Sequence, residues 1–246
     1  MFLSLMMICH LSCDTDNTLT CLKTDGKMIT EEYELASFDS IIVYERVQLI
    51  VKDAPVVSVI LETGENLLED FEVFVTNNTL IIKNNASCNL VRDYDTSILR
   101  VSHPSIRQVR NSSGRTVMGD GLISWESLRL VSDDLVEEDF FHKSGDFDME
   151  LDAQDVLLQS NGLSNFFIRG AVTNLDINLL EGDSRLPLND LAVQNVTIFH
   201  RGTNDVLIAP QLSITGELRS TGNLILTSNP PVVDVTAFFT GRVIFE

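Results

Sequence analysis

The chain has 246 residues, and its 36 acidic and 17 basic side chains give a formal net charge of -19 at pH 7. So acidic a surface repels a phosphate backbone, which excludes nucleic acid as an expected partner. Hydrophobic residues make up 44% of the chain, which excludes disorder caused by low hydrophobicity and high charge and predicts a packed fold.

The N-terminal residues predict an export signal followed by a lipid anchor. Residues 2–11 form an apolar run that is too short to span a bilayer but has the length of a signal-peptide core. The run ends at Ser12-Cys13, which resembles the lipobox of bacterial lipoproteins, where the cysteine is acylated. His10 and the lack of a basic residue before the run depart from that pattern, so an upstream start, an atypical signal or a buried strand are the alternatives. We expect a signal peptide over residues 1–12, lipidation at Cys13 and a tether over residues 13–30.

The residues after the tether predict short β-strands. Segments rich in Val, Ile and Phe, bounded by polar turns, occupy residues 38–51, 56–61, 71–75 and 80–82. Helical periodicity is nearly absent, and only residues 65–70 could form a single helical turn. No segment reaches 18 consecutive apolar residues, so the sequence predicts no transmembrane helix.

Regularly spaced glycines mark the second half of the chain. They stand at Gly162, Gly182, Gly202 and Gly222, each 20 residues after the last, and Gly145 precedes them at a spacing of 17. Each glycine is followed by a few polar residues and a short apolar segment. Self-similarity at this period is typical of repeat architectures, in which each unit buries its apolar face on its neighbours. We therefore expect Gly162, Gly182, Gly202 and Gly222 to lie in a row.

The predicted fold class is all-β, specifically a right-handed parallel β-helix with coils of about 20 residues. Residues 31–246 would form one domain. Within it, residues 31–100 would supply less regular strands that form the first coils or a cap, and residues 101–246 would form the repeat coils. A β-sandwich is the alternative, because it also uses short strands and frequent turns.

Four stretches of the sequence resemble the bacterial putative auto-transporter adhesin family with a head GIN domain, which is common among Bacteroidetes lipoproteins. They read GKMITEEYELASFDSI, ETGENLLEDFEV, NNTLIIKNNASCNLVRDY and TSNPPVVDVTAFFTGRVIFE, and the likeness runs from about Gly26 to the C-terminus. The glycine-led turns of the family survive in degenerate form at residues 162–165 and 202–204. The resemblance implies a β-helix related in shape to pectin lyases, exposure at the cell envelope, a role in adhesion and no transferable catalytic residues.

One predicted strand carries a row of carboxylates. In the segment DFDMELD, strict alternation places Phe147, Met149 and Leu151 on one face and four acids on the other. The acids could bind Ca²⁺ or a cationic partner, and paired acids also serve glycan hydrolysis. A solvated outer face is the interpretation we favour, so we expect no metal and no cofactor. The weak metal candidates are Asp146, Asp148, Glu150 and Asp152.

Other chemistry-bearing residues are sparse. The sequence contains no P-loop, G-x-S-x-G, H-E-x-x-H or C-x-x-C motif. His103, His142 and His200 are far apart in the sequence, which favours structural roles over catalytic ones. The phenylalanines of the repeat region are expected mostly at inward-facing positions, which weakens the case for sugar binding by stacking.

The cysteines predict one disulfide. Signal cleavage would remove Cys9 and acylation would use Cys13, which leaves Cys21 and Cys88 in an oxidising compartment. The spacing of the first three cysteines fits no zinc pattern. We predict a Cys21–Cys88 disulfide, and the alternative is that Cys88 is a small buried hydrophobic residue.

Two functions from different classes follow. The first is a cell-envelope lipoprotein whose non-catalytic β-helix serves adhesion or scaffolding. The second is a polysaccharide-acting lyase or hydrolase on the same kind of fold. The expected partners of the first are the membrane, through the N-terminal lipid, and an unknown protein or glycan. The expected location is the outer membrane or cell surface, with a periplasm-facing orientation as the alternative.

Overall fold

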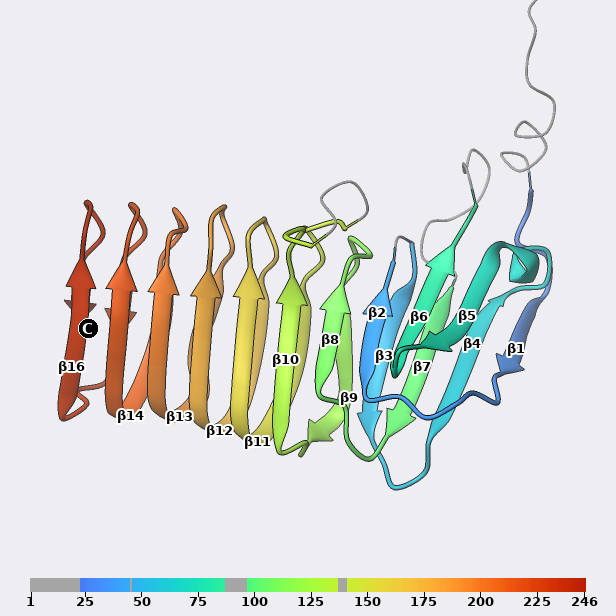
Figure 1. Cartoon of the computed structure of the whole chain (residues 1–246), viewed down its shortest axis with the longest axis horizontal. Helices are drawn as coiled ribbons and strands as arrows, with labels where there is room; N and C mark the ends of the chain where they lie inside the picture. Colours follow the sequence, from blue (N-terminus) through green and yellow to red (C-terminus); the bar gives the residue numbers. More distant parts are fainter. Residues whose placement is uncertain (1–22, 45, 87–96, 137–140) are drawn as a thin grey trace, which may run out of the picture.

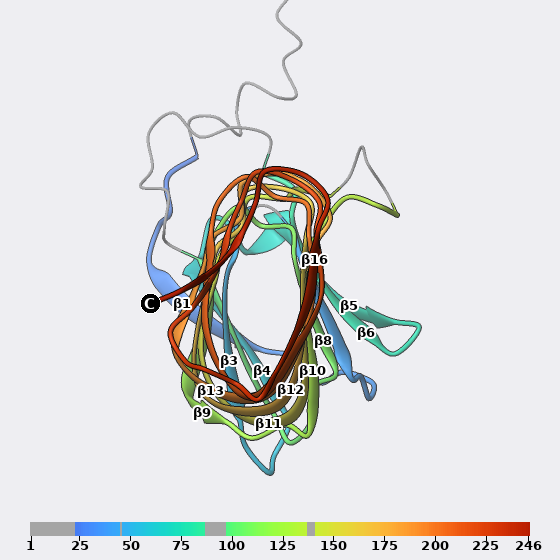
Figure 2. The ribbon, with the colours of Figure 1, turned by 90° about the vertical axis from the view of Figure 1, so that its left-hand side faces the viewer.

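The computed structural model describes residues 23–44, 46–86, 97–136 and 141–246, and within them the chain is almost entirely β-structure. Seventeen strands of these described residues form one large mixed sheet, which curls into an elongated body (Figure 1). Seen along the long axis, the strands lie one behind another around an oval outline (Figure 2). The core consists of buried hydrophobic side chains from both halves of the chain. Among these residues the sole helix is the 3-10 turn η1 (Leu68–Asp70). None of the described helices is long and apolar enough to cross a membrane.

The second half of the molecule is a regular parallel stack. Its strands are β10 (Ser127–Ser132), β11 (Phe147–Ser160), β12 (Phe166–Leu179), β13 (Leu186–His200), β14 (Val206–Leu218), β15 (Leu224–Leu226), β16 (Val232–Ala237) and β17 (Val243–Phe245). Each pairs in parallel with strands about one period away, so that Phe147 faces Phe166 and Leu186 faces Val206. The period of the sequence is therefore the distance along the chain between neighbouring strands.

The glycine row is confirmed. The backbone N–H of Asp183 donates to the carbonyl of Gly162 (2.9 Å), that of Thr203 to Gly182 (3.0 Å), and that of Gly222 to Gly202 (3.3 Å). The turns pack so closely that a Cβ atom on Gly182 would clash with the carbonyl of Gly162. Only glycine leaves room for this approach. Gly145 does not join the row, because it packs against Asn111 instead.

The first half is less regular. It contains β1 (Met28–Glu32), β2 (Ser40–Val43), β3 (Gln48–Asp53), β4 (Ser58–Gly64), β5 (Phe71–Thr76), β6 (Thr79–Asn84), β7 (Ile98–His103), β8 (Gln108–Asn111) and β9 (Val117–Ile123). The pairs β2–β6, β2–β8, β3–β7 and β3–β9 are parallel. In contrast, β1–β4, β4–β7 and β5–β6 are antiparallel. The sheet is thus mixed, which corrects the expectation of uniformly parallel strands.

A tight turn explains one antiparallel pair. Strands β5 and β6 are joined by Asn77 and Asn78, whose φ angles are 47° and 62°. Two consecutive residues with positive φ form the type I′ turn that suits a two-residue hairpin, and asparagine tolerates this conformation better than most residues. A parallel connection needs a far longer crossover. The two asparagines therefore fix β5 and β6 as a hairpin.

Candidate binding surface

Apolar side chains form a row on the outer face of the parallel stack. Pro187 lies beside Leu207 in register, Leu207 beside Ile225, and Ile225 beside Ile244. Phe167 is on the strand before Pro187, where the N–H of Phe166 donates to the Arg185 carbonyl (3.0 Å), and it lines the same groove as Pro187. Phe167 is 44% exposed and Ile244 is 38% exposed. Alternation along each strand explains the placement, because the flanking residues point into the core. We call Phe167, Pro187, Leu207, Ile225 and Ile244 the outer apolar row.

A ladder of polar residues runs beside this row, where each strand begins. Asn165 donates its backbone N–H and side-chain Nδ2 to Asp146 Oδ1, at 2.7 and 3.0 Å. Asn165 Oδ1 in turn accepts the backbone N–H of Arg185 (3.2 Å). These bonds satisfy backbone groups in the turns between strands and hold the ladder residues in fixed positions.

The same series of Asp, Asn and Arg, joined by the same hydrogen bonds, recurs further along the stack, and we call each such series a block. Asn223 donates its backbone N–H and Nδ2 to Asp205 Oδ1, at 2.8 and 2.9 Å, and Asn223 Oδ1 accepts the backbone N–H of Arg242 (3.0 Å). The ladder therefore consists of two equivalent blocks, and the boundary between Arg185 and Asp205 falls in the middle of the stack.

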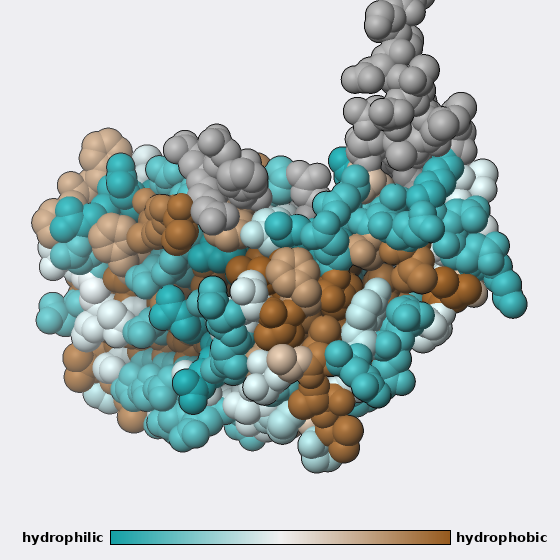
Figure 3. Space-filling model, turned by 45° about the vertical axis from the view of Figure 1, so that its right-hand side comes forward, coloured by the Kyte–Doolittle hydropathy of each residue, from teal (hydrophilic) through white to brown (hydrophobic). Residues whose placement is uncertain are grey.

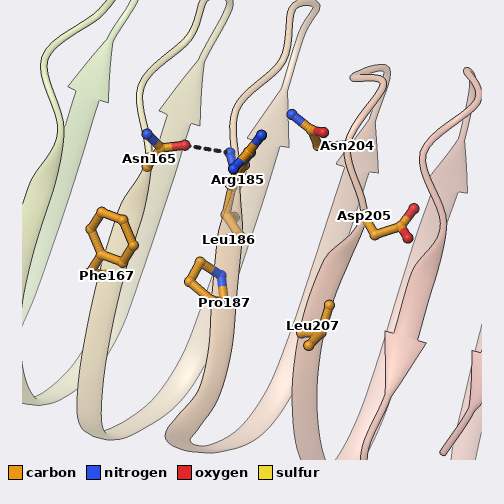
Figure 4. Close-up of a pocket in the computed structure, with 8 residues that line it drawn as sticks. All are labelled: Asn165, Phe167, Arg185, Leu186, Pro187, Asn204, Asp205 and Leu207. Atoms are coloured by element: carbon orange, nitrogen blue, oxygen red, sulfur yellow. Dashed lines mark hydrogen bonds between the residues drawn. The ribbon is translucent and has the colours of Figure 1, made fainter.

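A groove lies at this boundary (Figure 4). Its volume is about 480 Å³, within the range of about 300–1,000 Å³ common for ligand sites. Three members of the outer apolar row, Phe167, Pro187 and Leu207, line its apolar part, and Leu186 also contributes. The polar part is supplied by Asn165, Arg185, Asn204 and Asp205. Only the backbone of Arg185 is engaged in the ladder, and its guanidinium makes no ion pair with any residue that the structure describes.

Hydrophobic side chains are also exposed over the first half, among hydrophilic ones (Figure 3). A hollow of about 210 Å³ there is lined in part by Lys52, Arg100 and Asp120. Lys52 forms an ion pair with Asp120 (2.8 Å), and Arg100 forms one with Glu62 (2.8 Å). Because these charges are already paired and the hollow is smaller, the groove over β12, β13 and β14 is the stronger candidate site.

The predicted acidic strand has the expected alternation. Phe147, Met149 and Leu151 are buried, whereas the four acids lie outside the core. Asp146 belongs to the polar ladder, and Asp148 pairs with Arg169 (2.5 Å). Within the described residues no group of three or more candidate ligands converges on a metal position. The structure therefore gives Asp146 and Asp148 structural contacts and leaves Glu150 and Asp152 exposed.

The two buried histidines have structural partners. His200 Nδ1 accepts the backbone N–H of Gly202 (3.3 Å), and its Nε2 lies 2.9 Å from the Asn204 carbonyl. This pattern fits a neutral ring with the proton on Nε2, and burial lowers the pKa of His200. His103 Nδ1 likewise accepts the N–H of Ser105 (3.0 Å), and burial lowers its pKa too. His103 and His200 lie in different halves and do not form a shared site.

The predicted anchor and disulfide lie outside the described residues. Cys13, Cys21 and Cys88 fall within residues 1–22 and 87–96, whose placement the structure does not describe. Lipidation at Cys13 and the Cys21–Cys88 disulfide stay predictions.

Sequence reasoning missed the outer apolar row. The expectation that the repeat-region phenylalanines mostly face inward is right for Phe147 and Phe166, which are fully buried and stacked with ring centroids 5.1 Å apart. It is wrong for Phe167, which is exposed in the groove. Alternation along NFFI contains this signal, since two adjacent strand residues cannot both face the core. The Asp-Asn-Arg order before successive strands was also visible in the sequence but was not recognised.

Comparison with known proteins supports the fold. A putative adhesin from Bacteroides fragilis superposes with a TM-score of 0.78 at 16% identity, covering 91% of this chain and 99% of its own. A putative adhesin from Parabacteroides merdae gives 0.61 at 13% identity, covering 91% and 99%. A putative lipid binding protein from Parabacteroides distasonis gives 0.60 at 10% identity, covering 89% and 97%. At such identities the likeness concerns the fold alone.

No curated protein matches the sequence. The family model described as "Putative auto-transporter adhesin, head GIN domain" matches residues 37–230. This range includes the groove and most of the outer apolar row. The chain belongs to the family of putative auto-transporter adhesins with a head GIN domain.

Proposed function

We propose that the protein is a cell-envelope lipoprotein that binds its ligand without catalysis, in the groove over β12, β13 and β14. The observation that carries this proposal is the groove itself, in which apolar side chains in strand register lie beside fixed polar ones. Binding sites commonly combine an apolar surface with a few oriented polar groups. The family, whose members are described as putative adhesins, supports a role in attachment or scaffolding.

The proposal includes a finer description of the fold. The curled sheet would act as a right-handed β-helix with coils of about 20 residues, whose antiparallel N-terminal strands serve as a cap. The parallel registers of β11 to β15 and the glycine row support this description. Such a scaffold offers a long, rigid face on which equivalent positions repeat with the spacing between strands, about 4.8 Å.

The ligand that fits this face is an extended chain of a protein or a glycan. The outer apolar row runs across the strands, so a ligand lying on it would meet a new apolar side chain at each strand. The Arg185 guanidinium and the Asn204 side chain lie at the groove and could bind polar groups of such a chain. The one neighbour described as a putative lipid binding protein makes a lipid a further probe to include.

The enzyme alternative has weaker support from this groove. Paired-acid glycoside hydrolysis needs two carboxyl groups on either side of the reacting bond. The residues lining the groove include a single carboxylate, Asp205, and its Oδ1 already accepts two hydrogen bonds from Asn223. A binding role therefore requires fewer additional groups than a catalytic one.

A lipid anchor at Cys13 would place this surface at the envelope. Lipidation at Cys13 would tether the protein to the outer membrane, facing either the outside or the periplasm. Replacement of Cys13 by Ser should move the protein from the membrane fraction to the soluble fraction and abolish fatty-acid labelling. Labelling that persists would rule out Cys13 as the anchor.

Binding is tested by comparing two substitutions on exposed apolar positions. The wild-type chain, Phe167→Ser and Leu212→Ser would be screened against immobilised polysaccharides, mucin, collagen, laminin and phospholipid vesicles. Leu212 is 50% exposed and lies outside the groove, so it controls for a general loss of surface hydrophobicity. We expect Phe167→Ser to weaken binding at least about tenfold, as for an aromatic residue central to an interface, and Leu212→Ser to leave it unchanged. Equal binding by all three proteins would contradict the assignment of the groove.

A further inference from the structure

The two ends of the molecule differ in how far the core and the strand edges are covered. At the N-terminal end, β1 pairs with β4 and ends in Glu31 and Glu32. Charged residues on an edge strand discourage pairing with other chains. The segment that contains η1 also covers the core there, and its Leu67 is only 5% exposed. Strand β5 also keeps a free edge, since its one register among the described residues is with β6, but the core at this end is covered.

The C-terminal end is open. Strand β16 pairs with β14, and β17 pairs with β15. No other strand of the described residues has a register with either of them. Val233 lies over the buried Ile214, and Phe245 lies over the buried Leu226, so both face the core. Nevertheless Val233 is 38% exposed and Phe245 is 54% exposed, because nothing described covers this end of the core.

Few charges oppose association at this end. The last nineteen residues contain only Asp234, Arg242 and Glu246 as charged side chains, whereas the whole chain carries a net charge of -19. Phe238 and Phe239, in the turn between β16 and β17, are 56% and 62% exposed. Repulsion between two copies would therefore be low where their C-terminal ends meet.

We propose that this open end, formed by β16, the following turn and β17, is an interface with a second copy of the same chain. The two edges lie on opposite sides of the open core, since β16 is on one side of the oval and the C-terminus, just after β17, is on the other (Figure 2). A partner must therefore supply at least two strand edges and an apolar core surface. The C-terminal end of a second copy presents all three.

Symmetry makes this pairing self-limiting. A twofold axis across the end places strands of opposite direction next to each other, so that both edges gain antiparallel partners. The interface is isologous, because the same surface is used by both copies. The N-terminal ends, where the core is covered, then point away from each other, and the assembly stops at two copies.

Other occupants fit less well. A lipid surface could cover the apolar side chains but could not satisfy the backbone N–H and C=O groups along the two edges. A single added strand would satisfy one edge and leave the other edge and the core uncovered. The dimer satisfies both edges together, and it uses residues that lie outside the proposed binding groove.

One substitution tests the edge without disturbing the ladder inside the molecule. Phe238 donates its N–H to the Leu218 carbonyl (2.8 Å), and backbone groups alternate in direction along a strand. The N–H of Val235 therefore points to the free edge. Val235→Pro removes this donor and blocks pairing there, as prolines do on edge strands, while the bonds between β14 and β16 remain.

A second substitution tests the open core. Val233→Asp places a charge on the surface that the partner would cover, whereas Thr236→Asp places the same charge on the outward face of β16 and serves as the matched control. Each change would be made in the full chain carrying Cys13→Ser, and strand content would be checked by circular dichroism. If Val233→Asp unfolds the protein, the effect of Val235→Pro on dimer formation tests the proposal instead.

Sedimentation velocity at near-physiological salt gives the readout. We expect the starting chain to reach twice its monomer mass of 27.4 kDa as concentration rises, and Val235→Pro and Val233→Asp each to raise the dimer dissociation constant at least about tenfold. Thr236→Asp should leave it unchanged. A starting chain that stays monomeric up to about 0.5 mM, assemblies larger than two copies, or dimers that survive both substitutions would overturn the proposal.

Discussion

The two halves of the molecule bury their apolar side chains by different means. In the second half, parallel strands repeat at nearly constant spacing, and glycine turns stack with direct backbone contact. In the first half, a hairpin, two further antiparallel pairs and several ion pairs join strands of mixed direction. The comparison indicates that the second half depends on repeated backbone geometry, whereas the first depends on individual side chains. Single substitutions in each half test this difference.

The largest effect is expected in the glycine row. Gly182 has a φ of +90°, and a Cβ atom on it would clash with the Gly162 carbonyl. Gly182→Ala should lower the free energy of unfolding by at least about 3 kcal/mol. Gly121 in β9 has a similar φ of +84° but no atom within 4 Å of its would-be Cβ, so Gly121→Ala should cost only about 1 kcal/mol. Chemical denaturation measures the free energy of unfolding of both variants. Equal losses would show that the close contact between stacked turns costs nothing beyond the strain of a positive φ.

A buried ion pair near the junction of the halves gives the next effect. Arg110 on β8 contacts Asp133 at 3.0 Å, and the side chain of Asp133 is only 1% exposed. Arg110→Met would leave that carboxylate buried without its charge partner, which typically costs about 3 kcal/mol or somewhat more. The matched control is Arg169→Met, whose partner Asp148 is 40% exposed. Because exposed pairs contribute about 0–1 kcal/mol, a control loss as large as that of Arg110→Met would contradict this reasoning.

Acid should weaken both halves through their buried histidines. Burial lowers the pKa of His103 and of His200 in the folded state, whereas an unfolded histidine titrates near pH 6.5. As pH falls below about 6.5, the unfolded chain binds protons that the folded chain does not, so the free energy of unfolding decreases. The slope approaches about 1.4 kcal/mol per pH unit for each histidine. His200→Gln should reduce this slope, and an unaltered slope in His200→Gln would argue against the assignment.

The smallest effect concerns the hairpin of the first half. Asn78, with a φ of 62°, occupies the second turn position, where glycine after asparagine is the strongest type I′ signal. Asn78→Gly should therefore raise the free energy of unfolding slightly, by up to about 0.5 kcal/mol. Asn78→Val should lower it by about 1–2 kcal/mol, because a β-branched residue fits positive φ poorly. Thermal unfolding can rank the stability of the three proteins. An Asn78→Val protein as stable as the wild type would contradict the requirement for positive φ at this turn.

The second half was predictable because its signal repeats. The spacing of Gly162, Gly182, Gly202 and Gly222 fixes the distance between neighbouring strands, and the alternation of Phe147, Met149 and Leu151 fixes which face is buried. Each repeat of the sequence supports the one before it, so a local irregularity does not hide the pattern. The all-β class and the glycine row followed directly from these residues.

The first half was harder because its contacts depend on single turns. Residues 38–51 look like one strand, but the chain divides them into β2 and β3 at a turn that includes Arg46, whose φ is 65°. An arginine does not indicate a turn with positive φ, whereas glycine or asparagine would. The antiparallel pairing of β4 with β7 joins segments about 40 residues apart, which no local pattern reveals.

The candidate site was only partly predictable for a related reason. The exposed position of Phe167 follows from alternation, but the groove also needs the side chains of neighbouring strands to leave a hollow between them. That depends on side-chain volume and direction at Pro187 and Leu207, and on the ladder bonds that fix Asn165 and Arg185. The open C-terminal end likewise depends on which strand edges remain unpaired. The sequence of β16 and β17 does not determine this.

Hydrogen–deuterium exchange with and without a ligand found in the binding screen tests the central claim most directly. If the parallel stack carries the binding surface, protection should appear in the first residues of β12, β13 and β14, around Phe167, Pro187 and Leu207, and should be absent from β4 to β7. Protection confined to the first half, with no change around these three residues, would contradict the account.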